Sequence, residues 1–229
     1  ALLGMALAFE VPMRTVVDLI LAHGPRVFSH RPLPNGAVSR LLDLSRSVTG
    51  PKYGGRELRE ALRGVLGDRR LGDALHPLVV PAVDVLACRT KVFKTPHGAV
   101  RESDAELPIV DVVMAACAAP AYFPSVIVGA RLYADGGLFA VAPDQIALHE
   151  AQHFLGIAPE RVSMLSVGTA TAGYRPREGV EDPQAGAVSW LSEGRLVLTL
   201  LSVQQQHVQA MLEDRPGSRY LRLDAPWPA

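Results

Sequence analysis

The chain has 229 residues, 48% of them hydrophobic and 20% charged, and its 23 basic side chains balance its 23 acidic ones. This length and composition predict a single globular domain with a sizeable core. Zero net charge and the lack of a basic run exclude nucleic acid as an expected partner, and no apolar run reaches the length of a membrane span.

Helical and β patterns alternate along the chain. Helices are predicted over residues 1–9, 13–23, 36–47, 56–66, 104–117, 143–155 and 188–212, strands over 77–87, 91–95, 125–133, 161–167 and 220–223, and loops over 24–35 and 173–185. Strands that alternate with helices predict an α/β layer fold with a mostly parallel sheet. The apolar segments 11–21 and 196–201 could touch lipid, but packing in a core is the preferred interpretation for both.

Asp135-Gly136-Gly137 is the most informative motif, because it stands where a predicted strand gives way to a helix. Two glycines after an acid allow the backbone to turn sharply and to approach another group closely. The carboxylate is then held at the rim of the sheet, where it could serve as a catalytic base.

Further motifs flank this turn. Residues 115–124 read Ala-Ala-Cys-Ala-Ala-Pro-Ala-Tyr-Phe-Pro, residues 162–169 read Val-Ser-Met-Leu-Ser-Val-Gly-Thr, residues 218–224 read Ser-Arg-Tyr-Leu-Arg-Leu-Asp, and Lys52-Tyr53 precedes an amphipathic helix. In this order, and over nearly the whole chain, the motifs resemble the bacterial type of the patatin-like phospholipase family of lipid acyl hydrolases. The resemblance implies a three-layer α/β/α sandwich with a mostly parallel central sheet.

The resemblance also implies a chemistry. Family members use a serine nucleophile and an aspartate base without histidine, and Asp135 matches that aspartate. Gly136 and Gly137 would let the turn approach the nucleophile. The implied substrate is a fatty-acyl ester or a phospholipid, with transient contact at a membrane surface and a cytoplasmic or membrane-peripheral location. No cofactor and no metal are implied, acyl transfer is an alternative to hydrolysis, and the oligomeric state is left open.

The nucleophile itself does not occur in the chain. The family carries it in a Gly-x-Ser-x-Gly elbow, and residues from Ala1 onward already have a helical pattern. We therefore expect residues 1–229 to be an N-terminally truncated, inactive piece of one patatin-like domain, with the serine about two to four residues before Ala1. Ser166 is the nearest internal mimic, but Met164 stands where the elbow needs glycine, so a buried strand end is preferred. The alternative is a non-catalytic lipid-binding or scaffold module.

The chain departs from the family pattern at two places, and one acid lies inside a predicted strand. Val141-Ala142-Pro143 replaces the Asn-x-Pro that usually follows the turn, which removes a polar brace. Cys117 stands where the family often has a small hydroxyl residue, and both Cys88 and Cys117 are expected to be reduced core thiols. Asp84 lies within a predicted strand, and hydrogen bonding to a turn is its preferred role.

His149-Glu150-Ala-Gln-His153 is a rival motif, because His-Glu-x-x-His on a helix is a zinc-hydrolase signature. A third histidine of the longer signature would fall at Pro159, which cannot bind a metal. Glu178 or Glu181 could be the third ligand, but both lie in the predicted polar loop. A solvated helix face is therefore the preferred interpretation, and a zinc hydrolase is the less favoured alternative.

Overall fold

The computed structural model describes residues 1–29, 50–100, 104–168, 186–191, 195–215, 217 and 219–225. It divides into two compact units, Ala1–Gly136 and Gly137–Ala229. Both units combine helices with strands, which confirms the predicted α/β class. The predicted helix over 36–47 and the predicted loop over 173–185 lie outside the described residues.

Helices of the first unit follow the apolar spacing of the sequence closely. They are α1 (Leu2–Ala8), α2 (Met13–Val27), α4 (Arg56–Leu66) and α5 (Ile109–Ala116), with a 3₁₀ turn at Leu71–Asp73. α4 has the predicted bounds, because Gly55 adopts a left-handed conformation just before it and Leu58, Leu62 and Leu66 are buried on one side. α2 continues past Pro25, where the sequence predicts a loop, and the burial of Val27 accounts for the extra turn.

A four-stranded sheet supports these helices. Its strands are β1 (Val79–Asp84), β2 (Arg89–Lys94), β3 (Val126–Val128) and β4 (Arg131–Asp135), in the order β2-β1-β4-β3. Every neighbouring pair in it is antiparallel, so the prediction of a mostly parallel sheet is wrong for these strands. The reason is local: β3 and β4 are joined by the two residues Gly129-Ala130, with Gly129 at φ 61°, and only antiparallel strands can be joined so tightly. The single strand predicted over 125–133 is thus a hairpin.

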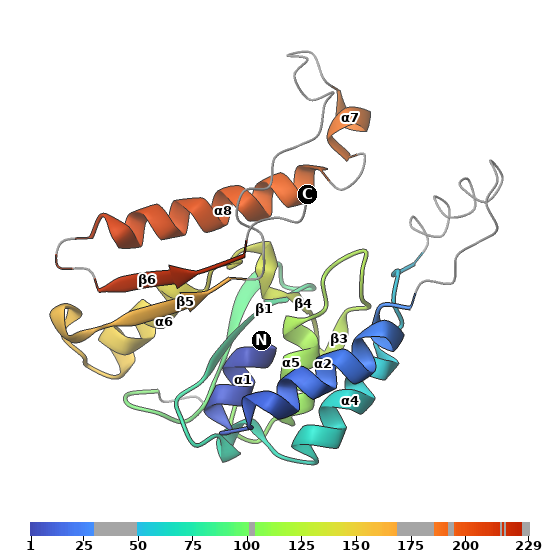
Figure 1. Ribbon diagram of the computed structural model, residues 1–229, viewed down its shortest axis with the longest axis horizontal. Helices are drawn as coiled ribbons and strands as arrows, with labels where there is room; N and C mark the ends of the chain where they lie inside the picture. The colour runs from blue at the N-terminus through green and yellow to red at the C-terminus, as the bar shows by residue number, and fades with distance from the viewer. Residues whose placement is uncertain are drawn as a thin grey trace. The chain divides into compact units, whose positions relative to one another are not determined.

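The core of the first unit lies between the sheet and its helices. α5 packs against β1, β3 and β4, α4 packs against α5, and α2 packs against α4 (Figure 1). Ile109, Val112 and Val113 of α5 have no exposed surface, because they face the sheet on one side and α4 on the other. α5 therefore holds β4, the inner strand that ends at Asp135, in place.

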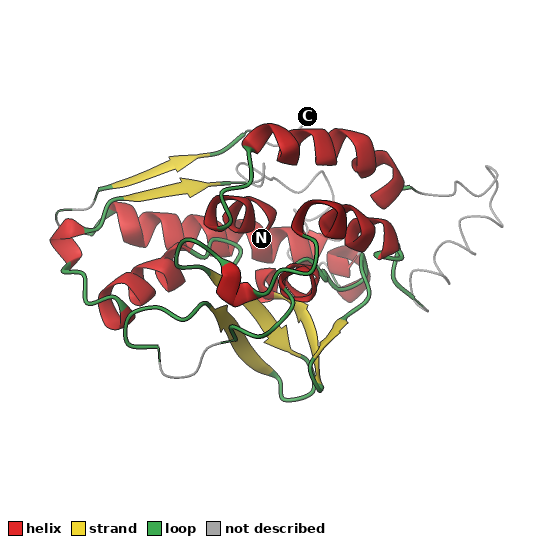
Figure 2. Cartoon of the chain, turned by 90° about the horizontal axis from the view of Figure 1, so that it is seen from below, coloured by secondary structure: helices red, strands yellow, loops and turns green. Residues whose placement is uncertain are grey.

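The described part of the second unit contains two short helices, a long helix and a pair of strands. Its elements are α6 (Asp144–His149), a π-helical turn at Glu150–Phe154, a 3₁₀ turn at Pro159–Arg161, β5 (Met164–Val167), α7 (Ala187–Leu191), α8 (Arg195–Glu213) and β6 (Tyr220–Leu223). β5 and β6 are parallel, and α8 runs beside β6 (Figures 1 and 2). Leu165, Val167, Leu221 and Leu223 are exposed on one face of this pair. No helix among the described residues is long and apolar enough to cross a membrane.

Candidate functional site

Asp135 is the last residue of β4, at the point where the sheet turns into the short 3₁₀ helix Gly136–Leu138. It pairs with Ala82 of β1 in the ladder, and its backbone N–H donates to the carbonyl oxygen of Ala118 at 3.0 Å. Its side chain is partly exposed. The backbone of this carboxylate is therefore held from two sides while the side chain stays accessible, which suits a proton acceptor.

The loop that holds Asp135 is built from residues 117–124, which follow α5. The carbonyl of Ala119 accepts the N–H groups of Tyr122 and Phe123 at 3.0 and 2.9 Å, and Ala121 adopts the left-handed conformation at φ 69°. The carbonyls of Ala121 and Tyr122 in turn accept the N–H groups of residues 52 and 53, at 2.9 and 2.8 Å. The structure thus brings together three motifs that are far apart in the sequence: residues 52–53, 115–124 and 135–136.

Cys117 lies at the centre of this arrangement and is partly buried. Burial raises the pKa of its thiol, and the carboxylate of Asp135 raises it further. The raised pKa keeps Cys117 a neutral thiol, as expected for an unreactive cysteine. Cys88, in contrast, is exposed in the β1–β2 turn, so the prediction that it is a core thiol is wrong.

Gly136 is required by a close approach to β1. A Cβ atom at this position would lie 2.3 Å from the carbonyl oxygen of Pro81, which is backbone and cannot rotate away. The sequence predicts a close approach here, and the structure identifies β1 as the neighbour. The absence of a side chain at Gly136 therefore allows the turn to lie close to the backbone of β1.

Gly136→Ala should therefore destabilise the protein by about 1–3 kcal/mol, since β1 and β4 must move apart to admit the methyl group. The free energy of unfolding in urea measures the effect. Gly64→Ala is the matched control: Gly64 lies inside α4 with no atom within 4 Å of the new Cβ, and alanine should stabilise the helix there by about 0.5–1 kcal/mol. Equal effects of the two substitutions would contradict the contact with Pro81.

Asp84 has the structural role that the sequence predicts. Its Oδ1 accepts the N–H of Ala87 in the hairpin turn at 3.0 Å, and its Oδ2 accepts from Arg131 at 2.8 Å. These bonds, the one from Arg131 above all, hold the pKa of the Asp84 carboxyl below its usual range. The carboxylate thus joins the β1–β2 turn to β4, and it takes no part in the candidate site.

The pKa of Asp84 is lower in the folded than in the unfolded state. The ionised carboxylate therefore stabilises the folded protein at pH values above the unfolded pKa, and this stabilisation is lost as the pH falls through the folded pKa. Asp84→Asn should lower the free energy of unfolding at pH 7, and the difference from wild type should shrink below about pH 4. Urea titrations across this range measure it. Arg131→Gln should reproduce the same pH dependence, and a difference that stays constant with pH would contradict the assignment.

The second unit contains a buried polar cluster that was not predicted from the sequence. Arg222 donates to the hydroxyl of Ser166 at 2.7 Å and to Asp224 at 2.8 Å, and Oδ2 of Asp144 lies 3.9 Å from its Nη1. Gln205 of α8 also donates to Asp224, at 3.0 Å. Ser166 is thus a buried residue of β5, as the preferred interpretation has it. The alternation of polar Tyr220, Arg222 and Asp224 with leucines is the signal that could have revealed the cluster.

Pro143 directly precedes α6, and Asp144 after it is buried. The segment Val141-Ala142-Pro143 therefore still leads into a helix although it lacks the asparagine of the family pattern.

The rival His-Glu-x-x-His motif does not form a metal cluster in the described residues. The rings of His149 and His153 are exposed and stacked, with centroids 5.2 Å apart and planes at 11°. Glu150 is buried, which the prediction of a solvated face for all three residues did not anticipate. No group of three or more histidine, cysteine, aspartate or glutamate side chains among the described residues is arranged to bind a metal ion, and Glu178 and Glu181 lie outside them.

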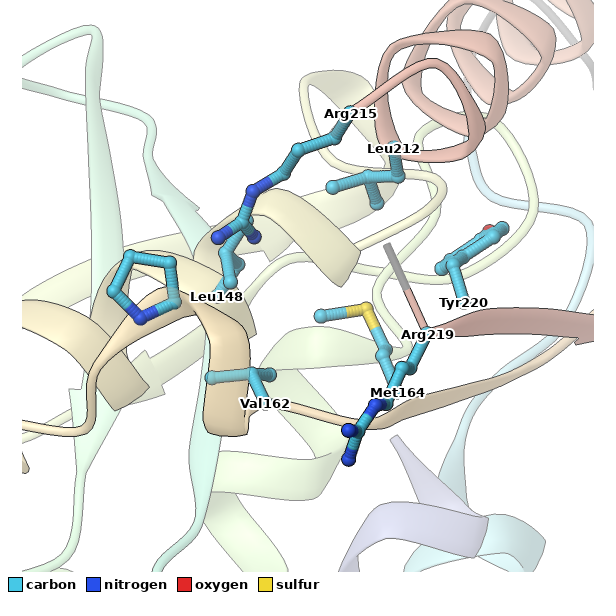
Figure 3. Close-up of a pocket in the computed structure, with 8 residues that line it drawn as sticks. Leu148, Val162, Met164, Leu212, Arg215, Arg219 and Tyr220 are labelled. Atoms are coloured by element: carbon cyan, nitrogen blue, oxygen red, sulfur yellow. The ribbon is translucent and has the colours of Figure 1, made fainter. Parts of the chain in front are cut away.

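A small hollow in the second unit is lined by Leu148, Pro159, Val162, Met164, Leu212, Arg215, Arg219 and Tyr220. Its volume is about 20 Å³, enough for one or two water molecules. Arg215 extends toward Leu148, whereas Arg219 points in another direction, so the two cations do not converge on one ligand (Figure 3). A volume of about 20 Å³ is too small for a lipid substrate.

Comparison with known proteins finds a family model and several curated relatives that match the chain. A family model described as patatin-like phospholipase matches residues 1–148, which include residues 52–53, 115–124 and 135–137. His149, His153 and Ser166 lie beyond the match. The matched residues are therefore those that surround Asp135 in the first unit, together with the start of the second.

Curated relatives carry related names. The chain is 34% identical over 226 residues to a cGAMP-activated phospholipase of Pseudomonas aeruginosa (strain BWHPSA011 / Pa011), covering 97% of this chain and 64% of that protein. It is 28% identical over 222 residues to a cGAMP-activated phospholipase of Vibrio cholerae, covering 92% and 62%. Patatin-like protein 1 of Arabidopsis thaliana is 30% identical over 111 residues, 48% of this chain and 26% of that protein. The chain thus spans less than two thirds of the length of these relatives.

Proposed function

Because this chain belongs to the patatin-like phospholipase family, we propose that the complete protein is a lipid acyl hydrolase in which Asp135 is the catalytic base. Its partner would be a serine nucleophile that lies a few residues before Ala1. Gly136 and Gly137 would form the turn that presents the carboxylate to this serine. The substrate class is carboxylic esters of fatty acids, in phospholipids or neutral lipids.

One observation carries this proposal: Asp135 ends β4 directly before a turn, with its backbone N–H held by Ala118 and its side chain partly exposed. α1 begins at Leu2, so a serine a few residues before Ala1 would stand just before a helix. A nucleophile elbow has this geometry, with its serine at a sharp turn just before a helix. In the proposed site Asp135 and this serine are neighbours without any intervening histidine.

The chemistry follows from the roles of the two groups. A serine hydroxyl is a weak nucleophile until a base takes its proton. Asp135 would accept that proton while the serine oxygen attacks the ester carbonyl carbon, and it would then give the proton to the departing alcohol. A water molecule, deprotonated by the same carboxylate, would release the fatty acid from the acyl-enzyme. Backbone N–H groups upstream of this chain would stabilise the oxyanion of both steps.

The test is an assay of the complete protein with a water-soluble p-nitrophenyl ester and with phospholipid vesicles. We expect hydrolysis of both, and covalent labelling of one serine before Ala1 by a fluorophosphonate. No labelling and no hydrolysis would instead support a non-catalytic lipid-binding module. Stoichiometric bound zinc, with activity lost on chelation, would support the zinc alternative through His149 and His153.

The names of the Pseudomonas and Vibrio relatives support a second, regulatory proposal. We propose that a cyclic dinucleotide activates the complete protein. Ester hydrolysis measured with and without cGAMP tests this, and equal rates would contradict it while leaving the dyad untouched.

We also propose that the complete domain is a three-layer α/β/α sandwich. The exposed apolar face of β5 and β6 supports this, because parallel strands are normally covered on both faces. An experimental structure of the complete protein, with a layer of structure over that face, is the expected result. A face open to solvent would contradict it.

A further inference from the structure

α2 carries a row of exposed apolar side chains. Met13, Val17, Ile20 and Leu21 fall on one side of the helix, and Phe28, one residue beyond its end, continues the row. These five residues, the α2 stripe, are between 44% and 70% exposed. The row borders the packed side of α2, on which Val16 and Val27 are buried. The expectation that segment 11–21 packs wholly in a core is therefore wrong for this side of the helix.

The α2 stripe ends at the loop that holds Asp135. The ring of Phe28 contacts the rings of Tyr53 and Phe123 edge-on, with centroids 5.4 and 6.2 Å away. Phe123 belongs to the loop of residues 117–124, and Ala118 of the same loop accepts the N–H of Asp135. Tyr122, next to Phe123, is also exposed. The end of the α2 stripe thus contacts the segment beside the proposed base.

Cations outnumber acids along the stripe. Arg14 borders it on α2, and Lys52 is exposed, with its Nζ 5.4 Å from the centre of the Tyr53 ring that Phe28 contacts. Asp18 is the opposing acid on the helix. An apolar row with basic neighbours is the pattern of helices that lie in the interface of an anionic bilayer, with the apolar side between the headgroups and the acyl chains.

We propose that the α2 stripe docks the complete protein on an anionic phospholipid bilayer and so brings the Asp135 loop to its substrate. This inference rests on the proposed lipid acyl hydrolase activity and names the surface at which that activity meets its lipid. The occupant is the bilayer itself: the row is apolar enough to enter it, and the charges of Arg14 and Lys52 complement its phosphates.

Vesicle binding of the complete protein with Asp135→Asn tests the docking, since an inactive protein leaves the vesicles intact. The probe is vesicles of phosphatidylglycerol and phosphatidylcholine in roughly equal parts. Leu21→Glu should lower the vesicle-bound fraction by about tenfold or more, because a charged side chain replaces the leucine side chain that would be buried in the bilayer. Leu86→Glu is the matched control: Leu86 is 79% exposed and Leu21 70%, but Leu86 lies in the β1–β2 turn and should not change binding.

Arg14→Glu provides a second variant that tests the charges. It should weaken binding to the anionic vesicles and leave binding to pure phosphatidylcholine unchanged, and added salt should remove the difference. Equal binding of wild type, Leu21→Glu and Arg14→Glu would overturn the proposal. So would a Leu21→Glu variant that binds vesicles normally but changes its oligomeric state in sedimentation, because the stripe would then be a contact between two copies.

A soluble substrate separates this inference from the proposed function. In the active protein, Leu21→Glu should slow hydrolysis of vesicle phospholipid and leave hydrolysis of p-nitrophenyl butyrate unchanged. Failure of the wild type to hydrolyse p-nitrophenyl butyrate would contradict the proposed function, whereas the Asp135→Asn binding experiment would still decide the docking.

Discussion

Asp135→Asn in the complete protein should lower the rate of ester hydrolysis by at least about a hundredfold, because an amide cannot accept the serine proton. The loss should appear with p-nitrophenyl esters and with phospholipid alike, since the step is common to both. Asparagine has the same shape as aspartate, and the bond from the backbone N–H of residue 135 to Ala118 does not involve the side chain. The fold should therefore persist.

Thermal unfolding and circular dichroism of the variant check that persistence. Asp68→Asn is the matched control, because Asp68 is an exposed aspartate of the same unit that follows α4. It should hydrolyse esters at the wild-type rate. Retention of more than a few per cent of activity by the Asp135 variant, with the control unchanged, would show that another group takes the proton.

Arg222→Ala should destabilise the protein by about 3–5 kcal/mol, which is the cost of leaving buried charges without their partner. Burial by itself lowers the pKa of Arg222, but the interactions with Asp224 and Tyr220 together outweigh it, so the pKa lies above its usual value and the guanidinium stays charged. Its removal leaves Asp144 and Asp224, each less than a tenth exposed, without that cation. Ser166 also loses the donor at its hydroxyl.

The free energy of unfolding in urea measures this effect. Arg219→Ala is the matched control, because Arg219 lies beside the same strand but is exposed, and its loss should change stability by less than about 0.5 kcal/mol. Arg222→Lys should fall between the two, since lysine keeps the charge but cannot bond Ser166 and Asp224 together in the same planar geometry. Similar values for the two alanine variants would show that the cluster contributes little.

The sequence by itself determined the elements whose signal is local. The spacing of Leu58, Leu62 and Leu66 predicts α4 with its observed bounds, and the alternation over residues 220–223 predicts β6. The Asp-Gly-Gly turn at the end of a strand is likewise readable from neighbouring residues alone, because glycine and an apolar period act over a few positions. The family resemblance also depends only on the order of such short motifs.

Tertiary structure decided what those elements contact. The hairpins of β1–β2 and β3–β4 make the sheet antiparallel, although alternation looks the same in either direction. Gly136 meets Pro81, and Arg222 meets Ser166, across separations that no local pattern spans. The apolar residues of α2 form one wide face in the sequence, yet Val16 and Val27 are packed and the α2 stripe beside them is exposed. The physical reason is common to all: periodicity reports which face of an element is apolar, and only the assembled neighbours decide which face is covered.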